Sequence, residues 1–261
     1  MNRIKPSINK SEYILITGAT SGFGEACALL FASEGYPLIL TGRRKDKLSK
    51  LSQKITTEFK VKVIELCFDV RDFEECQIAF SSLKNEAQKI GVLINNAGLA
   101  VGKGPINEGL LDDWNRMIDT NVKGLLHVSK CIIPFMQEKK SGHIINIGSI
   151  AGKEVYPGGN VYCASKHAVD ALSKAMRIDL LEHKIKVTNI APGAADTEFS
   201  NVRFKGNKEL VNAVYNGYTP LFSTDIAEAC YFVATRPANV NINDLVIMPT
   251  AQASSQNLIR E

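Results

Sequence analysis

The chain has 261 residues, of which 45% are hydrophobic and 22% are charged, and its formal net charge at pH 7 is +4. This composition supplies enough apolar material for a globular core and excludes a disordered chain. The weak, dispersed positive charge and the 7% of aromatic residues exclude the basic, aromatic-rich surface of a typical nucleic-acid-binding protein.

The chain also lacks the segments expected of membrane, secreted and metal-binding proteins. No apolar run approaches the roughly 18 residues that span a bilayer, and residues 1–10 contain no apolar signal-peptide segment. The six cysteines form no Cys-x-x-Cys pair and several lie in apolar runs, which indicates reduced thiols. The four histidines share no ligand spacing, so no metal site is expected. We expect a cytoplasmic protein with no nucleic-acid or membrane partner.

Short apolar runs alternate with longer amphipathic segments, which indicates repeated β–α units around a parallel sheet. This alternation predicts a Rossmann-type doubly wound α/β fold, in which a parallel sheet of about seven strands lies between two layers of helices. The predicted strands are 13–16, 37–40, 61–68, 92–94, 143–147, 186–190 and 245–248. The predicted helices are 22–34, 45–58, 73–88, 112–137, 162–182 and 225–235.

The first predicted strand leads into a glycine-rich turn that opens a helix, Thr17-Gly18-Ala19-Thr20-Ser21-Gly22-Phe23-Gly24. Gly18 allows a tight turn, Gly22 lacks the Cβ that would block a pyrophosphate, and Gly24 allows the helix to pack on the strand. The unpaired N–H groups at the start of the helix are suited to bind an anion. The turn therefore predicts a dinucleotide site, with a plain glycine turn as the alternative.

The end of the second predicted strand indicates which dinucleotide binds. An NAD site would place Asp or Glu here on the ribose 2′-hydroxyl, but the chain reads Arg43-Arg44-Lys45 and has no carboxylate before Asp46. Two guanidinium groups are suited to bind a 2′-phosphate. Because cations at a helix amino end oppose the helix dipole, an anionic ligand explains them better than a solvated surface does. NADP(H) is therefore the predicted cofactor.

A tyrosine and a lysine lie one helical turn apart in the segment Tyr162-Cys163-Ala164-Ser165-Lys166. A free phenol has a pKa of about 10, and a nearby ammonium group would lower it toward the value that a general acid or base needs. Ser149, on the loop after a predicted strand, has a hydroxyl that is suited to hold a substrate oxygen. Each feature by itself is weak, since a serine after a glycine is usually a turn residue.

Taken together, these motifs resemble the short-chain dehydrogenase/reductase family, in order and over nearly the whole chain. The resemblance implies catalytic roles for Asn121, Ser149, Tyr162 and Lys166, with Asn121 helping to hold a water that links the lysine to solvent. Beyond the glycine turn, Arg43 and Arg44, the positions that match the family's cofactor contacts are Asp69, Val70, Asn95, Asn96, Ala97, Gly98, Tyr162, Lys166, Pro192, Gly193, Ala195 and Thr197. A single NADP-binding domain over residues 1–261 is expected.

Longer phrases, among them 18–25, 114–125 and 197–206, resemble the NADP-dependent 3-hydroxy acid dehydrogenase branch of the family. That resemblance implies a homotetramer acting on serine, L-allo-threonine or small acids of the 3-hydroxypropionate type. A reductase of bulkier ketoacyl, sugar or steroid carbonyls and a non-catalytic NADPH sensor remain alternatives.

Residues 192–219 form the longest irregular stretch of the sequence, and this length predicts a mobile substrate flap at about 193–219. A hydroxy acid needs a cationic partner for its carboxylate. Arg203 and Lys205 in the flap are the candidates, unless they are solvated surface charges.

Overall fold

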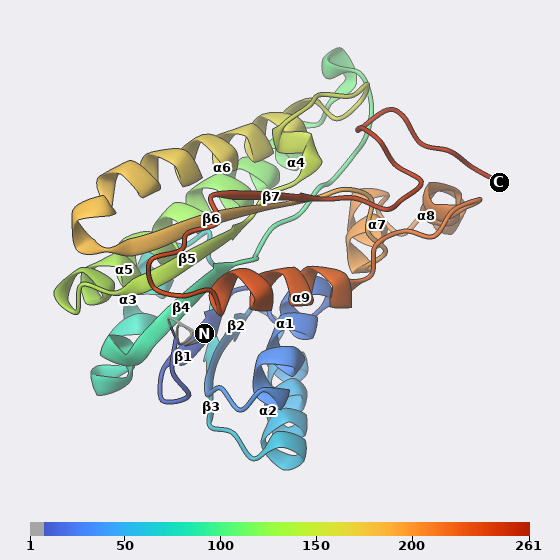
Figure 1. Cartoon of the computed structure of the whole chain (residues 1–261). Helices are drawn as coiled ribbons and strands as arrows, with labels where there is room; N and C mark the ends of the chain where they lie inside the picture. The colour runs from blue at the N-terminus through green and yellow to red at the C-terminus, as the bar shows by residue number, and fades with distance from the viewer. Residues whose placement is uncertain (1–7) are drawn as a thin grey trace, which may run out of the picture.

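A parallel sheet forms the centre of the computed structural model, which describes residues 8–261. Residues 1–7 lie outside the described part, and they belong both to the predicted domain 1–261 and to the segment 1–10 that was searched for a signal peptide. Within the described residues the sheet has seven strands in the order β3-β2-β1-β4-β5-β6-β7 (Figure 1). The strands are β1 (Tyr13–Ile16), β2 (Leu38–Gly42), β3 (Val63–Cys67), β4 (Ile90–Asn95), β5 (Gly142–Ile147), β6 (Ile185–Pro192) and β7 (Asp244–Ile247). The predicted fold class is confirmed.

The central strands are apolar on both faces because each face lies against a separate core. Along β1, Ile14 and Ile16 pack into one cluster of buried side chains, whereas Tyr13 and Leu15 pack into the other. Successive side chains of a strand point to opposite faces. Continuous apolar runs are therefore the pattern expected of buried parallel strands.

Helices cover both faces of the sheet, with α6 above it and α9 below it in Figure 1. One layer consists of α1 (Gly22–Ser33), α2 (Lys45–Phe59) and α9 (Ser223–Ala234). The other contains α3 (Phe73–Ser81), α5 (Leu125–Glu138) and α6 (Asn160–Asp179), and α4 (Leu111–Ile118) packs against α6. None of the helices within residues 8–261 has the length and apolarity needed to cross a membrane.

Two predicted helices are interrupted. The segment predicted at 73–88 is helical only to Ser81 and continues as a 3-10 helix at Lys84–Lys89. The segment predicted at 112–137 changes to a π-helix at Asp119–Gly124, between α4 and α5. The hydrophobic period alone did not indicate either break. The wider turn contains Asn121, and such turns are frequent at functional sites.

The predicted irregular stretch 192–219 contains two short helices, α7 (Glu198–Arg203) and α8 (Lys208–Tyr215). Helices of this length are marginal in isolation, so they depend on capping and tertiary contacts. Thr197 and Asn207 accept hydrogen bonds from backbone N–H groups in the first turns of α7 and α8. The helix predicted to start at Asp225 begins at Ser223, and the Asp225 carboxylate caps it by accepting from the Phe222 N–H at 2.7 Å.

Gly24 allows α1 to pack directly on the turn that precedes it, so Gly24→Ala should destabilise the fold. An added Cβ would lie 2.5 Å from the Gly18 carbonyl oxygen and 2.5 Å from Asn96 Nδ2. We expect a loss of about 1–3 kcal/mol in the free energy of unfolding, measured by urea denaturation, because this overpacking exceeds the gain in helix propensity. Gly104→Ala, whose Cβ would meet nothing within 4 Å, is the control. Equal midpoints for the two variants would contradict the packing role.

Candidate active site

The predicted catalytic residues come together at the carboxyl ends of the central strands. Ser149 follows β5, Gly98 follows β4, and Pro192 is the last residue of β6. The loops that follow parallel strands meet at one edge of the sheet, where ligands of open α/β folds bind. The helix α6 brings Tyr162 and Lys166 to the same edge.

Tyr162 is buried beside Ser149, with only 9% of its surface exposed. The edge of its ring packs on Phe199 of α7, with the ring centroids 5.6 Å apart. Burial raises the pKa of the phenol well above its usual value, and a hydrogen bond with Ser149 and the charge of Arg203 act in the opposite direction. Tyr162 therefore holds its proton at neutral pH in this arrangement.

Lys166 lies one turn further along α6, but its amine is not directed at the phenol. Its Nζ donates a hydrogen bond of 2.8 Å to the carbonyl oxygen of Ile147. Burial lowers the pKa of Lys166 to about 8. The expectation that Lys166 lowers the pKa of Tyr162 is therefore wrong for this arrangement, because desolvation dominates at both groups.

Asn121 connects the π-helix to the loop after β4 and to α6. Its Oδ1 accepts a hydrogen bond from the Leu99 N–H at 2.8 Å, and its Nδ2 donates to the Leu99 carbonyl and to Ser165 Oγ. A Cβ on Gly98 would lie 3.2 Å from Asn121 Oδ1 and 3.6 Å from Lys166 Nζ. The structure thus places Asn121 and Lys166 around the same glycine.

The glycine turn has the features that a pyrophosphate needs. Gly18 and Gly22 have φ angles of +64° and +55°, in the left-handed region that favours glycine. Ser21 precedes α1 and makes no side-chain cap, so its hydroxyl does not occupy the N–H groups of the first turn. An added Cβ at Gly22 would come into contact with the Thr197 side chain, 3.4 Å from its Cβ. These residues fit a bound anion.

The two predicted phosphate-binding arginines make different contacts. Arg44 lies across the glycine turn, and its Nη2 donates to Thr20 Oγ1 at 2.9 Å and to Ser21 Oγ at 2.7 Å. Arg43 pairs with the Asp69 carboxylate at 3.4 Å. The cations that follow β2 and the glycine turn that follows β1 therefore belong to one site.

Several predicted cofactor residues act as supports of that site. The Asn95 side chain is buried and binds Ser129 and Asn146, whereas Asn96 Nδ2 donates to the backbone oxygens of Thr17 and Gly18. The N–H groups of Asn96 and Ala97 both donate to the hydroxyl of Thr17, a residue that the sequence reasoning did not single out for this role.

The remaining predicted contacts are tied to neighbouring elements. Arg71 forms a salt bridge of 2.6 Å with Asp69, and the Val70 carbonyl interacts with His127 Nδ1. The Gly193 N–H donates to the Ile247 carbonyl of β7, and the Ala195 carbonyl accepts from the Tyr215 hydroxyl.

Residues 12–208 match the family model described as short chain dehydrogenase. The chain belongs to the short chain dehydrogenase family. The family match covers the glycine turn, the catalytic candidates and α7, so the geometry described above is that of an oxidoreductase.

Relatives with specific names match over almost the whole chain. Sulfoacetaldehyde reductase 2 of Chromohalobacter salexigens is 44% identical, covering 94% of this chain and 97% of that protein. The NADP-dependent 3-hydroxy acid dehydrogenase YdfG of Salmonella typhi is also 44% identical, covering 92% and 96%. The closed form of a serine dehydrogenase complexed with NADP⁺ superposes with a TM-score of 0.88 at 41% identity, covering 95% and 99%.

In this short chain dehydrogenase, Arg203 of α7 lies beside the predicted catalytic residue Tyr162. Its guanidinium carbon is 5.4 Å from the ring centroid of Tyr156 and 5.7 Å from that of Tyr162. Its Nε is buried and has no hydrogen-bond partner in the described part of the chain. Lys205, the other candidate, is instead paired with Asp113 at 2.8 Å.

Sequence reasoning missed Tyr156 and Glu198, which lie at the edges of the site. Tyr156 makes a cation–π contact with Arg203, and Glu198 pairs with Arg44 at 2.9 Å. Glu198 and Arg44 are 154 residues apart, so no local pattern could have related them.

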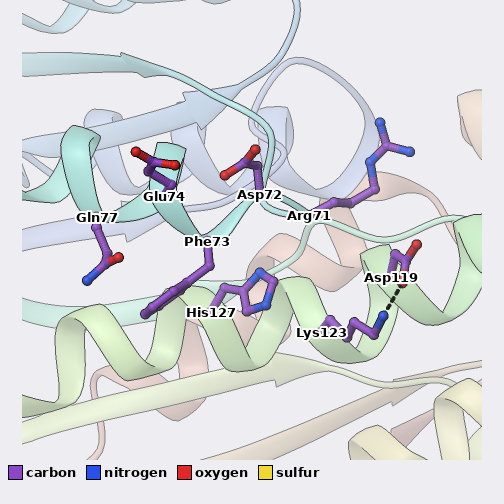
Figure 2. A pocket seen from close by; sticks show the side chains of 8 residues that line it. All are labelled: Arg71, Asp72, Phe73, Glu74, Gln77, Asp119, Lys123 and His127. Atoms are coloured by element: carbon purple, nitrogen blue, oxygen red, sulfur yellow. Dashed lines mark ion pairs between the residues drawn. The ribbon is translucent and has the colours of Figure 1, made fainter.

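A surface groove of about 740 Å³ is lined by none of the catalytic candidates, although two of its residues, Asp119 and Lys123, lie in the π-helix that contains Asn121 (Figure 2). Figure 2 shows the rings of Phe73 and His127 side by side, with centroids 5.3 Å apart, and the ion pair of Asp119 and Lys123. Its other lining residues are Arg71, Asp72, Glu74 and Gln77. Among the described residues, Arg71 connects the groove to the site through Asp69, and His127 does so through the Val70 carbonyl.

The buried amine of Lys166 predicts a pH dependence of stability. Its pKa is about 8 in the folded protein against 10.5 ordinarily, so between these values the unfolded chain binds more protons and stability rises with pH. We therefore expect the wild type to gain stability relative to Lys166→Met as the pH rises. The difference between their free energies of unfolding, wild type minus variant, should increase from about pH 7.5 to about pH 10 in urea titrations. Lys54→Met, at an exposed lysine of α2, is the matched control. Parallel pH profiles for the two differences would refute this.

Proposed function

We propose that the protein is an NADP-dependent dehydrogenase of small 3-hydroxy acids, of the serine, L-allo-threonine or 3-hydroxypropionate type. It would transfer hydride between C3 of the acid and the nicotinamide. The observation that carries the proposal is Arg203, whose buried Nε has no partner in the described part of the chain and lies beside the Tyr162 ring. A buried guanidinium donor without a partner is costly unless a ligand binds it.

The proposed cofactor is supported by charge and by similarity. Arg43 and Arg44 follow β2, where an NAD site would have a carboxylate. Relatives of the chain are named NADP-dependent, and the serine dehydrogenase structure is a complex with NADP⁺. The turn at Gly18–Gly24 and the start of α1 would hold the pyrophosphate, with Arg44 on the 2′-phosphate.

The names of the relatives point to one substrate geometry. A 3-hydroxy acid and sulfoacetaldehyde each have an acid group separated by one carbon from the carbon that reacts. A carboxylate has two oxygens that share its negative charge, and a sulfonate has three. A guanidinium group binds either anion through charge-assisted hydrogen bonds. Arg203 therefore supports a substrate with an anionic group at that spacing.

The proposed catalytic roles come from the resemblance to the family, and the proximity of Ser149 and Tyr162 supports them. When bound, the nicotinamide supplies or accepts the hydride. Tyr162 would donate its proton to the substrate oxygen during reduction and accept it during oxidation, and Ser149 would hold the same oxygen. Lys166, after exchanging its contact with Ile147, would bind the nicotinamide ribose, and Asn121 would help to hold the water that connects the lysine to solvent.

Three further features belong to this proposal. The chain would act as one domain with a mobile flap over residues 193–219, so that substrate can enter beneath α7. The resemblance to the 3-hydroxy acid dehydrogenase branch supports a homotetramer. The free, buried thiols of Cys27, Cys76, Cys163 and Cys230 support a cytoplasmic location.

Replacing Tyr162 by Phe removes the proposed acid/base while keeping the ring against Phe199. Because a positioned acid/base group contributes about 10²–10⁴ in rate, kcat should fall by at least 100-fold. NADPH binding, followed by its fluorescence, should be unchanged. A variant that retains half of its turnover would remove Tyr162 from the mechanism.

Replacing Arg203 by Gln tests the substrate class. With a 3-hydroxy acid, kcat/KM should fall by about 10- to 100-fold, the usual contribution of a hydrogen bond to a charged group. With the methyl ester of the same acid, the change should be less than about threefold, since the ester has no charge for the guanidinium to bind. Lys205→Gln is the control, because Lys205 is paired with Asp113. Equal losses on acid and ester would count against the proposed substrate.

A further inference from the structure

A carboxylate of the flap pairs with Arg44, a predicted phosphate-binding residue, and with the neighbouring cation of Lys47. Glu198, the first residue of α7, uses one oxygen to pair with Arg44 Nη1 at 2.9 Å and the other to pair with Lys47 Nζ at 2.9 Å. Lys47 lies in the first turn of α2, next to Arg44. One carboxylate thus bridges two cations at the place where the sequence predicts an anionic ligand.

Nη1 is the nitrogen of Arg44 that remains available to a phosphate. Its Nε and Nη2 donate to the hydroxyls of Thr20 and Ser21 and to the Thr20 carbonyl, which leaves Nη1 for an anion. Glu198 accepts from Nη1. The contacts with Lys47 and Arg44 lower the pKa of Glu198 to about 2, so the carboxylate remains charged at physiological pH.

We propose that Glu198 is a specificity-determining residue that competes with the 2′-phosphate of the cofactor for Arg44 and Lys47. The inference rests on the proposed NADP dependence and adds an internal competitor to it. A nucleotide with a 2′-phosphate displaces the Glu198 carboxylate, whereas a nucleotide with a free 2′-hydroxyl leaves it in place. Glu198 therefore lowers the affinity for the phosphorylated nucleotide alone.

The competition also acts on the flap, because Glu198 connects α7 to the rest of the site. The preceding residue, Thr197, caps α7 and lies beside Gly22. Within the same helix Phe199 packs on Tyr162, and Arg203 lies over its ring. Binding of the 2′-phosphate would release the amino end of the helix that supplies the proposed substrate-binding arginine.

The first test is the affinity of two nucleotides that differ only in the 2′-phosphate, adenosine 2′,5′-bisphosphate and adenosine 5′-monophosphate, measured by calorimetry. Glu198→Gln should bind the bisphosphate about fivefold more tightly, because the exposed ion pairs that compete with it are weak, and should bind the monophosphate with unchanged affinity. Glu209→Gln, which removes a charge from the exposed first turn of α8, should change neither affinity. An unchanged or weakened affinity of Glu198→Gln for the bisphosphate would overturn the inference, as would equal gains for both nucleotides.

The second test is amide hydrogen exchange of residues 198–203. In the wild type, the bisphosphate should accelerate exchange relative to the monophosphate, because the tether of α7 is displaced. In Glu198→Gln, exchange should be fast with either nucleotide. If the bisphosphate leaves wild-type exchange unchanged, the link to the flap is wrong.

Failure of the proposed function would look different from failure of this inference. A wild-type protein that binds the monophosphate as tightly as the bisphosphate would contradict the NADP preference itself. A clear preference for the bisphosphate that Glu198→Gln does not increase would contradict only the competition.

Discussion

The site depends on the close approach of the β1–α1 turn to the segment after β4. The Thr17 hydroxyl accepts two backbone N–H groups from that segment, and Asn96 returns two hydrogen bonds to the backbone of the turn. An added Cβ at Gly18 or Gly24 would lie within about 3 Å of atoms of this contact. The glycines therefore do more than allow a tight turn: they allow the ends of β1 and β4 to come together, at the edge of the sheet where open α/β folds bind their ligands.

Burial controls the chemistry of the residues that follow β5 and lie on α6. Tyr162 and Lys166 are each less than a tenth exposed. Burial disfavours the charged form of each group, so it raises the pKa of the phenol and lowers the pKa of the amine to about 8. The guanidinium group of Arg203 makes cation–π contacts with the rings of Tyr156 and Tyr162. A bound acid would place its negative charge beside this guanidinium, in a region where charges interact more strongly than in water.

The flap joins the two ends of the proposed active site. Glu198 at the start of α7 pairs with the cations beside the glycine turn, and Arg203 at its end makes a cation–π contact with Tyr162, the proposed acid/base. One short helix thus contacts both the cofactor side and the substrate side. The Arg203 carbonyl also accepts from the Gly102 N–H, and Lys205 pairs with Asp113, so several separate contacts hold this helix over the site.

The sequence by itself determined the sheet, the order of its β–α units and the residues of the glycine turn. Apolar runs and turn glycines act over a few neighbouring residues, so they can be recognised locally: β1 begins and ends at the predicted residues, and the other strands shift by a few residues at their ends. Only the tertiary structure decided the contacts between distant segments. The pairing of Arg44 with Glu198, the direction of the Lys166 amine toward Ile147 and the position of Arg203 over Tyr156 depend on which strand ends are neighbours. Likewise, the π-helix at Asn121 and the short helices of the flap depend on contacts that no hydrophobic period encodes, because their stability comes from capping and packing.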